Sequence, residues 1–143
     1  LDSDFTKSYK PDEIDEAINT LANADVLIGH NIIGFDLKAI KKIYPDFVEK
    51  NVIDTLVISR LVYPGLKDKD FIDRHDGMPL KLYGSHSLKA WGHRLSEYKD
   101  DYEGGFEEYN DDMLKYMEQD VVVTRKLWKH FHPYLNGSKW SSR

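Results

Sequence analysis

Two aspartates stand at positions where a carboxylate can do chemistry. Asp36 comes a few residues after residues 26–28, an apolar run that predicts a buried strand. Ligands of open α/β sheets bind at the carboxyl ends of strands, although an aspartate there also caps a following helix. Tyr116 and Asp120 lie four residues apart in a predicted helix and share one side of it. Asp120 borders the apolar stripe, so it needs a metal ion, a hydrogen-bond donor or water as its partner.

The composition is that of one globular domain. Among the 143 residues, 41% are hydrophobic and 31% charged, which excludes a disordered chain, and no apolar run approaches the roughly 18 residues of a membrane span. The absence of cysteine excludes disulfides and thiolate zinc sites and favours a cytoplasmic location. A formal charge of -5 is unsuited to holding duplex DNA by phosphate neutralisation, so we expect nucleic-acid contacts to be local or mediated by metal ions.

Hydrophobic periodicity predicts an α/β arrangement. Helices are predicted from residue 11 to about 22, after residue 34, at 56–62, at 87–95 and from about 110 to 131, with buried strands at 26–28 and 52–53. Strand, helix and strand in this order predict a parallel pair joined by a crossover. Residues 64–85 and 97–109 are predicted to be loops. We expect one domain over residues 1–135 and a flexible tail over 136–143.

The predicted sheet is too small to be complete. A two-stranded parallel pair is rarely stable without further strands beside it. Residues 5–9 are predicted to supply one edge strand. The chain begins without Met and without a signal peptide, so we expect a piece of a longer protein. The remaining strands should then come from residues before Leu1 or from another chain.

Four sequence blocks, in order, resemble one family of nucleases. Residues 31–36, Asn-x3-Phe-Asp, and residues 116–120, Tyr-x3-Asp, are similar to the second and third motifs of the DnaQ-like 3'-5' exonucleases. Tyr116 lies four residues before Asp120, as in the tyrosine subgroup, whereas the histidine subgroup places its residue five before, where Lys115 stands. Residues 52–61 and 84–95 resemble the exonuclease domain of family A DNA polymerases from short-tailed bacteriophages.

The resemblance implies a ribonuclease-H-like core and a proofreading exonuclease of DNA replication. Such an enzyme uses two divalent ions, Mg²⁺ or Mn²⁺, to hydrolyse the 3'-terminal phosphodiester of single-stranded DNA, and carboxylate oxygens are the ligands that these ions prefer. Asp120 would bind the tighter ion directly and Asp36 would hold the second ion. Tyr116 would orient the attacking water. Asn31 and Phe35 would line the cleft for the terminal nucleotides, with Phe35 stacking on a base.

The first motif of the family is missing from the chain. It is an Asp-x-Glu in the middle of the opening strand, where it supplies ligands to both ions, and the nearest imitation, Asp2-Ser3-Asp4, lies too few residues before Asp36. The missing motif and the small sheet have one explanation, which is truncation of the N-terminal part. We therefore expect little nuclease activity and weak metal binding from this polypeptide alone, although the parent protein would be an enzyme with a polymerase domain.

Lysines and histidines elsewhere carry weaker signals. Lys67, Lys69 and Lys81 of the predicted long loop are candidates to contact the phosphates of an incoming strand, although lysines in loops are more often simply solvated. His86 and His93 lie seven residues apart and have no acidic or histidine partner at ligand spacing, which disfavours a histidine metal site.

The sequence therefore predicts an α/β, ribonuclease-H-like exonuclease domain, incomplete at its N-terminal side, from a phage-type family A DNA polymerase in an infected bacterium. One alternative is a non-catalytic, exonuclease-like module that binds single strands or scaffolds a polymerase. Another is an RNA-trimming nuclease of the ribonuclease D kind, which shares the tyrosine subgroup. The nuclease interpretation depends on Asp36 and Asp120 converging on one hollow that Tyr116 also faces.

Overall fold

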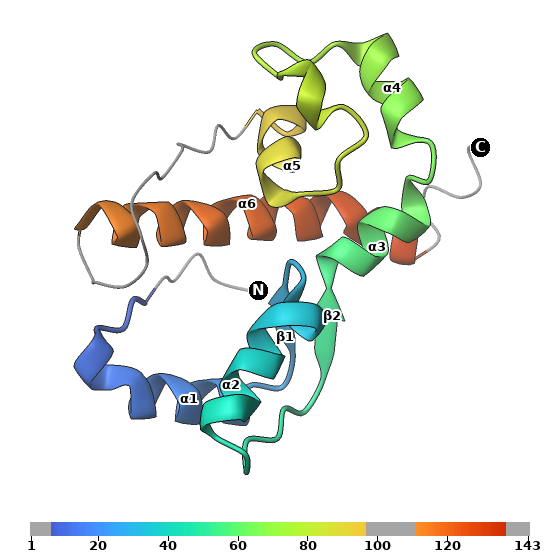
Figure 1. The fold of residues 1–143 in the computed structure, drawn as a ribbon. Helices are drawn as coiled ribbons and strands as arrows, with labels where there is room; N and C mark the ends of the chain where they lie inside the picture. The colour runs from blue at the N-terminus through green and yellow to red at the C-terminus, as the bar shows by residue number, and fades with distance from the viewer. Residues whose placement is uncertain (1–6, 97–110, 137–143) are drawn as a thin grey trace.

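The chain folds into a mostly helical structure with a small parallel sheet (Figure 1). The computed structural model describes residues 7–96 and 117–136 and the backbone of residues 111–116. Its elements are η1 (Pro11–Glu13), α1 (Ile14–Asn23), β1 (Leu27–Gly29), the π-helical turn η2 (Ile32–Asp36), α2 (Leu37–Ile43), β2 (Val52–Asp54), α3 (Thr55–Val62), α4 (Leu66–Asp73), η3 (Leu80–Leu82), α5 (Leu88–Arg94) and α6 (Asp111–Leu135). The predicted loop at 97–109 and residues 137–143 of the predicted tail lie outside the described residues.

The two strands form the predicted parallel pair. Leu27 lies opposite Val52 and Gly29 lies opposite Asp54, with α2 in the connection between the strands. Within the described residues the sheet has two strands, and a ribonuclease-H-like core stays a prediction.

The predicted edge strand at 5–9 is wrong over residues 7–9, and residues 5 and 6 lie outside the described part of the chain. Side chains of this segment bond to helices instead. Ser8 Oγ donates to Glu118 of α6 at 2.9 Å, and the hydroxyls of Tyr9 and Thr20 of α1 are 3.1 Å apart.

The strand and helix boundaries follow local signals. Pro11 and the acidic side chains after it begin the first helical segment, because proline lacks the N–H that a first turn cannot use and acids favour the helix N-terminus. Asp54 caps α3 by accepting the Leu56 N–H, and Ser87 caps α5 by accepting the Ala90 N–H.

The buried apolar residues form two hydrophobic cores. The smaller core joins β1, α2 and the connection to β2 through Leu27, Leu37 and Phe47. The larger core fills the space between α3, α5 and α6 and contains Ile58, Val62, Leu66, Trp91, Leu127 and Phe131. Helix α6 also contacts β1, so it connects both cores.

The prediction of a loop over residues 64–85 is wrong in part, because α4 and η3 form within it. α4 buries Leu66 and Asp70, and the second of these is held by residues far along the chain. The final helix runs four residues beyond its predicted end at Phe131, through Pro133 to Leu135. In the described part of the chain, no helix combines the length and the apolar character needed to cross a membrane.

Candidate functional site

The turn after β1 presents the second predicted motif to solvent. Asn31 adopts the left-handed conformation with a φ of 61°, which asparagine tolerates better than most residues. Its carbonyl accepts the Phe35 N–H at 3.0 Å inside η2, and π-helical turns occur often at functional sites. Phe35 is 67% exposed and Asp36 is exposed as well. This local fold therefore leaves Phe35 and Asp36 accessible to a ligand.

Asp36 does not cap the helix that follows it. It occupies the N-cap position of α2 with helical backbone angles, and its side chain makes no capping hydrogen bond. The alternative prediction, that Asp36 only caps the following helix, is therefore wrong. Its carboxylate is not used for helix capping and is therefore available to bind a ligand.

Asp54 lies directly behind this turn and is 5% exposed. Its Oδ1 accepts the backbone N–H of Asn31 at 2.8 Å and of Leu56 at 2.9 Å, and its Oδ2 accepts the N–H of Ile33 at 3.1 Å. Three donors satisfy a carboxylate that would otherwise be costly to bury. Sequence reasoning did not single out Asp54, although an aspartate between a strand and a helix is a signal for a helix cap.

The electrostatics of the turn favour a cation. Asp36 is exposed as a residue, but partial burial of its carboxyl group, and next the negative charge of Asp54, raise its pKa above the ordinary value. Both causes make the ionised form of Asp36 costly in the isolated chain. A positive ligand beside Asp36 would offset that cost.

A hydrogen-bond network joins two of the four motif blocks to the end of β1. His30 at the end of β1 bonds through Nδ1 to Thr55 Oγ1 at 2.9 Å and through Nε2 to the carbonyl of His86 at 2.8 Å. Ser59 Oγ bonds to His86 Nδ1 and accepts the Trp91 Nε1–H at 2.9 Å. The blocks at 52–61 and 84–95 are thus joined to each other and to His30, which directly precedes the block at 31–36.

The histidines of this network have structural partners. Burial, and next the positive charges of Arg94 and Arg60, lower the pKa of His86. Within the described residues, no three His, Asp or Glu side chains are grouped as a complete metal site.

Asp120 lies on α6, which runs beside β1. The helix is anchored by Val123, Leu127 and Phe131, a fully buried stripe with a spacing of four residues. Asp120 is half-buried, one of its carboxylate oxygens is buried, and its carbonyl accepts the Thr124 hydroxyl at 2.7 Å. The side chain of Tyr116 lies outside the described residues, although its backbone belongs to α6. Convergence of Asp36, Asp120 and Tyr116 stays a prediction.

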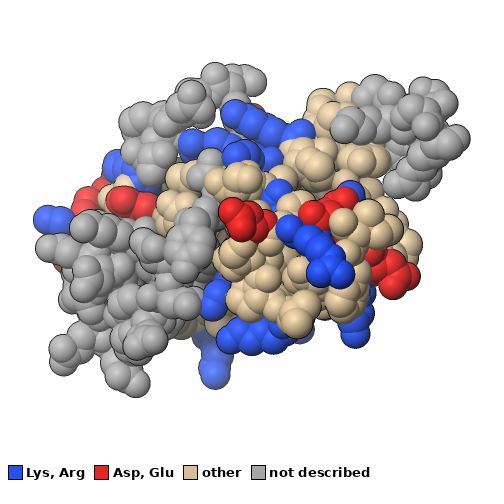
Figure 2. Space-filling view, turned by 90° about the horizontal axis from the view of Figure 1, so that it is seen from above, with Lys and Arg blue, Asp and Glu red and all other residues tan. Residues whose placement is uncertain are grey.

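The predicted nucleic-acid lysines lie elsewhere. Lys67 of α4 and Lys81 of η3 are exposed, and in Figure 1 both elements lie across α6 from the turn after β1. The backbone of Gly84 packs on Lys67, since a Cβ at Gly84 would lie 2.8 Å from Lys67 Cβ. Figure 2 shows Lys and Arg interspersed with Asp and Glu on the face seen from above. The two lysines are therefore separate from the turn that carries Asp36.

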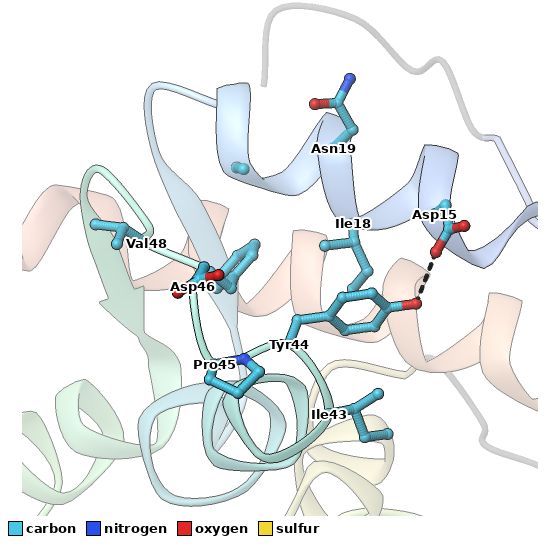
Figure 3. Close-up of a pocket in the computed structure, with 10 residues that line it drawn as sticks. Asp15, Ile18, Asn19, Ile43, Tyr44, Pro45, Asp46 and Val48 are labelled. Carbon is cyan, nitrogen blue, oxygen red and sulfur yellow. Dashed lines mark hydrogen bonds between the residues drawn. The ribbon is translucent and has the colours of Figure 1, made fainter.

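A shallow groove of about 550 Å³ lies between α1 and the connection from α2 to β2 (Figure 3). Its lining includes Ile18, Phe47 and Val48, and the Tyr44 hydroxyl donates to Asp15 at 2.9 Å. None of the predicted site residues lines this groove.

The donor set fits a divalent cation in part. Asp36 and Asp120 offer carboxylate oxygens, which Mg²⁺ and Mn²⁺ prefer. Two carboxylates are too few for two ions, and no Asp-x-Glu precedes Asp36 in the sequence.

Comparison with known proteins gives related polymerases. The chain is 34% identical to the DNA-directed DNA polymerase of Escherichia phage T7 over a 161-residue alignment that covers 88% of the chain and 23% of the phage protein. The DNA-directed DNA polymerase of Enterobacteria phage T3 aligns with the same identity and coverage. The chain resembles part of a phage DNA polymerase.

This similarity confirms the relation to phage DNA polymerases that the motif blocks predicted. The chain spans 23% of the length of these relatives. No family model matches it.

Proposed function

We propose that the chain forms part of the 3'-5' proofreading exonuclease of a DNA-directed DNA polymerase. The observation that carries this proposal is the turn after β1, which exposes Phe35 and Asp36 at the carboxyl end of a parallel strand beside the helix that bears Asp120. This geometry occurs in a chain that resembles phage DNA polymerases. The substrate is the 3' end of single-stranded DNA, in the cytoplasm of an infected bacterium.

Each side chain has a separate task in this proposal. Asp36 and Asp120 hold Mg²⁺ or Mn²⁺, and such ions, when bound, activate water and stabilise charge on the scissile phosphate. Tyr116 orients the attacking water rather than removing its proton, since a free phenol has a pKa near 10. Phe35 stacks on a terminal base and Asn31 lines the cleft beside it.

The proposal needs further ligands beside Asp36 and Asp120. An Asp-x-Glu on a neighbouring strand would complete the ion site and would extend the two-stranded sheet at the same time. A polymerase domain would supply the DNA end. Lys67 and Lys81, on the other side of α6, would contact phosphates away from the terminal nucleotides.

The test uses the full-length natural protein that contains these residues. A single-stranded DNA oligonucleotide with a 5' label should shorten from its 3' end in the presence of Mg²⁺, and Asp36→Asn and Asp120→Asn should each reduce the rate at least about 100-fold, because each removes a charged metal ligand. Asp46→Asn, an exposed aspartate at the separate groove, is the matched control and should keep the wild-type rate.

The same assay separates the alternatives. Binding of the oligonucleotide without shortening, at any Mg²⁺ or Mn²⁺ concentration, would identify a non-catalytic module. Faster shortening of a 3'-ribo strand than of a 3'-deoxy strand would identify an RNA-trimming nuclease.

A further inference from the structure

The buried carboxylate of Asp54 fastens two segments that are distant in the sequence. Its Oδ2 bonds to the Ile33 N–H, and its Oδ1 is shared by the N–H groups of Asn31 and Leu56. The Leu56 bond is an ordinary helix cap. The other two bonds belong to the turn that precedes Asp36, more than twenty residues earlier in the chain.

The turn needs this support. A left-handed residue other than glycine costs about 1 kcal/mol and persists where the surroundings hold it in place. Asn31, with its φ of 61°, is held through its own N–H by Asp54, and Ile33 is held two residues later. These two bonds fix the direction in which the backbone enters η2, the turn that ends at Asp36.

We propose that Asp54 is a positioning residue for the exonuclease, which fixes the place of Asp36, a residue that would hold the metal ion, by holding the backbone of the turn after β1. This inference rests on the proposed function. Asp54 itself is turned toward backbone donors and does not touch the substrate. It acts through the turn, as outer partners of metal ligands commonly do.

The competing explanation is that Asp54 only caps α3. Asp54→Asn separates the two roles. The amide oxygen keeps the bonds of Oδ1, including the cap, while the amide NH₂ replaces Oδ2 and opposes the Ile33 N–H with another donor. Asp54→Ser also keeps a good capping residue, but its short side chain does not reach the turn.

The experiment measures exonuclease rate against Mg²⁺ concentration in the full-length protein. We expect Asp54→Asn to raise the half-activating Mg²⁺ concentration about tenfold, which is typical when an outer partner of a metal ligand is lost, and excess Mg²⁺ to restore much of the rate. Asp54→Ser should raise it at least as far. A loss of folded protein alone lowers the maximal rate without changing the half-activating concentration.

Phe131→Leu is the control for stability. Phe131 is fully buried in the larger core, and its truncation leaves a cavity at the far end of α6. It should lower the melting temperature and leave the half-activating Mg²⁺ concentration unchanged.

The outcomes distinguish the two proposals. The positioning role alone would be overturned if the wild-type protein shortens DNA and the Asp54 variants have an unchanged half-activating Mg²⁺ concentration. A wild-type protein that shortens no single strand in Mg²⁺ or Mn²⁺ would overturn the proposed function and the positioning role with it.

Discussion

Asp70 of α4 and Arg94 of α5 form a buried, bidentate ion pair. Arg94 Nε donates to Oδ1 at 2.9 Å and Nη2 donates to Oδ2 at 2.7 Å, and the side chains are only 1% and 4% exposed. The same carboxylate accepts the Gly84 N–H at 2.8 Å. One aspartate therefore fastens α4 to α5 and to the segment between them.

Removing one partner of this pair should be strongly destabilising. Arg94→Met leaves the Asp70 carboxylate buried without its counter-ion, so we expect the free energy of unfolding to fall by about 3 to 5 kcal/mol. Urea denaturation followed by circular dichroism measures it. Lys69→Ala is the control, because the Lys69–Asp73 pair is half-exposed and should be worth at most about 0.5 kcal/mol. Equal losses in the two variants would show that burial of the pair is unimportant.

The same ion pair predicts how stability depends on pH. Burial acts to raise the pKa of Asp70, but the hydrogen bonds from Arg94 and Gly84 outweigh it, and the pKa lies below its usual value of 3.8. A carboxyl whose pKa is lowered by folding stabilises the protein above the unfolded value and loses that contribution as the pH falls through the folded value. Urea denaturation between pH 7 and pH 2 should therefore show the advantage of wild type over Arg94→Met shrinking as the pH falls, because the variant's buried carboxyl takes up a proton at a higher pH than the wild-type carboxyl does. A constant advantage over that range would contradict this origin.

The parts of the fold that follow from local sequence were predictable. The helices at α1, α3, α5 and α6 and the two strands have the expected periodicity or apolar runs. α4 was missed because five of its eight residues are charged, and its Phe71 and Ile72 are exposed, so its apolar pattern is weak. Asp70 resembles a surface acid in the sequence, while its partner Arg94 lies 24 residues away.

The candidate site shows the same limit. Asn31, Phe35 and Asp36 could be chosen from their spacing after an apolar strand, and the structure exposes the last two in one turn. The role of Asp54 could not be chosen in this way. Two of its three donors come from a turn that only the parallel pairing of β1 and β2 brings beside it.

Asp36 should reduce the stability of the chain at neutral pH. Its pKa is raised by burial and by Asp54, so the contribution of Asp36 to stability is lost as the pH rises from 3.8 through the folded value. Asp36→Asn removes that charge, and we expect a higher melting temperature than wild type at pH 7 and no difference at pH 3. Differential scanning calorimetry in metal-free buffer measures both. Asp46→Asn, at an exposed position, should leave the melting temperature unchanged at both pH values.

A gain in stability from Asp36→Asn together with loss of exonuclease activity in the full-length protein would mark Asp36 as a residue retained for function. A lower melting temperature at pH 7 would instead mean that the Asp36 carboxylate stabilises the turn.

Glycine at position 34 should be required for DNA binding, because it leaves room for the side chain of Asn31. A Cβ at residue 34 would lie 2.5 Å from Asn31 Oδ1, so Gly34→Ala must turn the Asn31 amide away from its position. The amide is the end of a side chain and can move, so the free energy of unfolding should change little. If Asn31 contacts the terminal nucleotides, loss of one hydrogen bond of about 1 kcal/mol should weaken single-stranded DNA binding by the full-length protein about fivefold. Fluorescence anisotropy with a labelled oligonucleotide measures the affinity.

Gly65→Ala is the matched substitution for this test, because no atom lies within 4 Å of the Cβ that it adds. It should leave the affinity for the oligonucleotide at the wild-type value. Equal affinities for Gly34→Ala and Gly65→Ala would remove Asn31 from the binding surface. Recognition of the terminal nucleotide would then have to come from the other exposed side chains of the turn, Phe35 and Asp36, because displacing the Asn31 amide would have had no effect on binding.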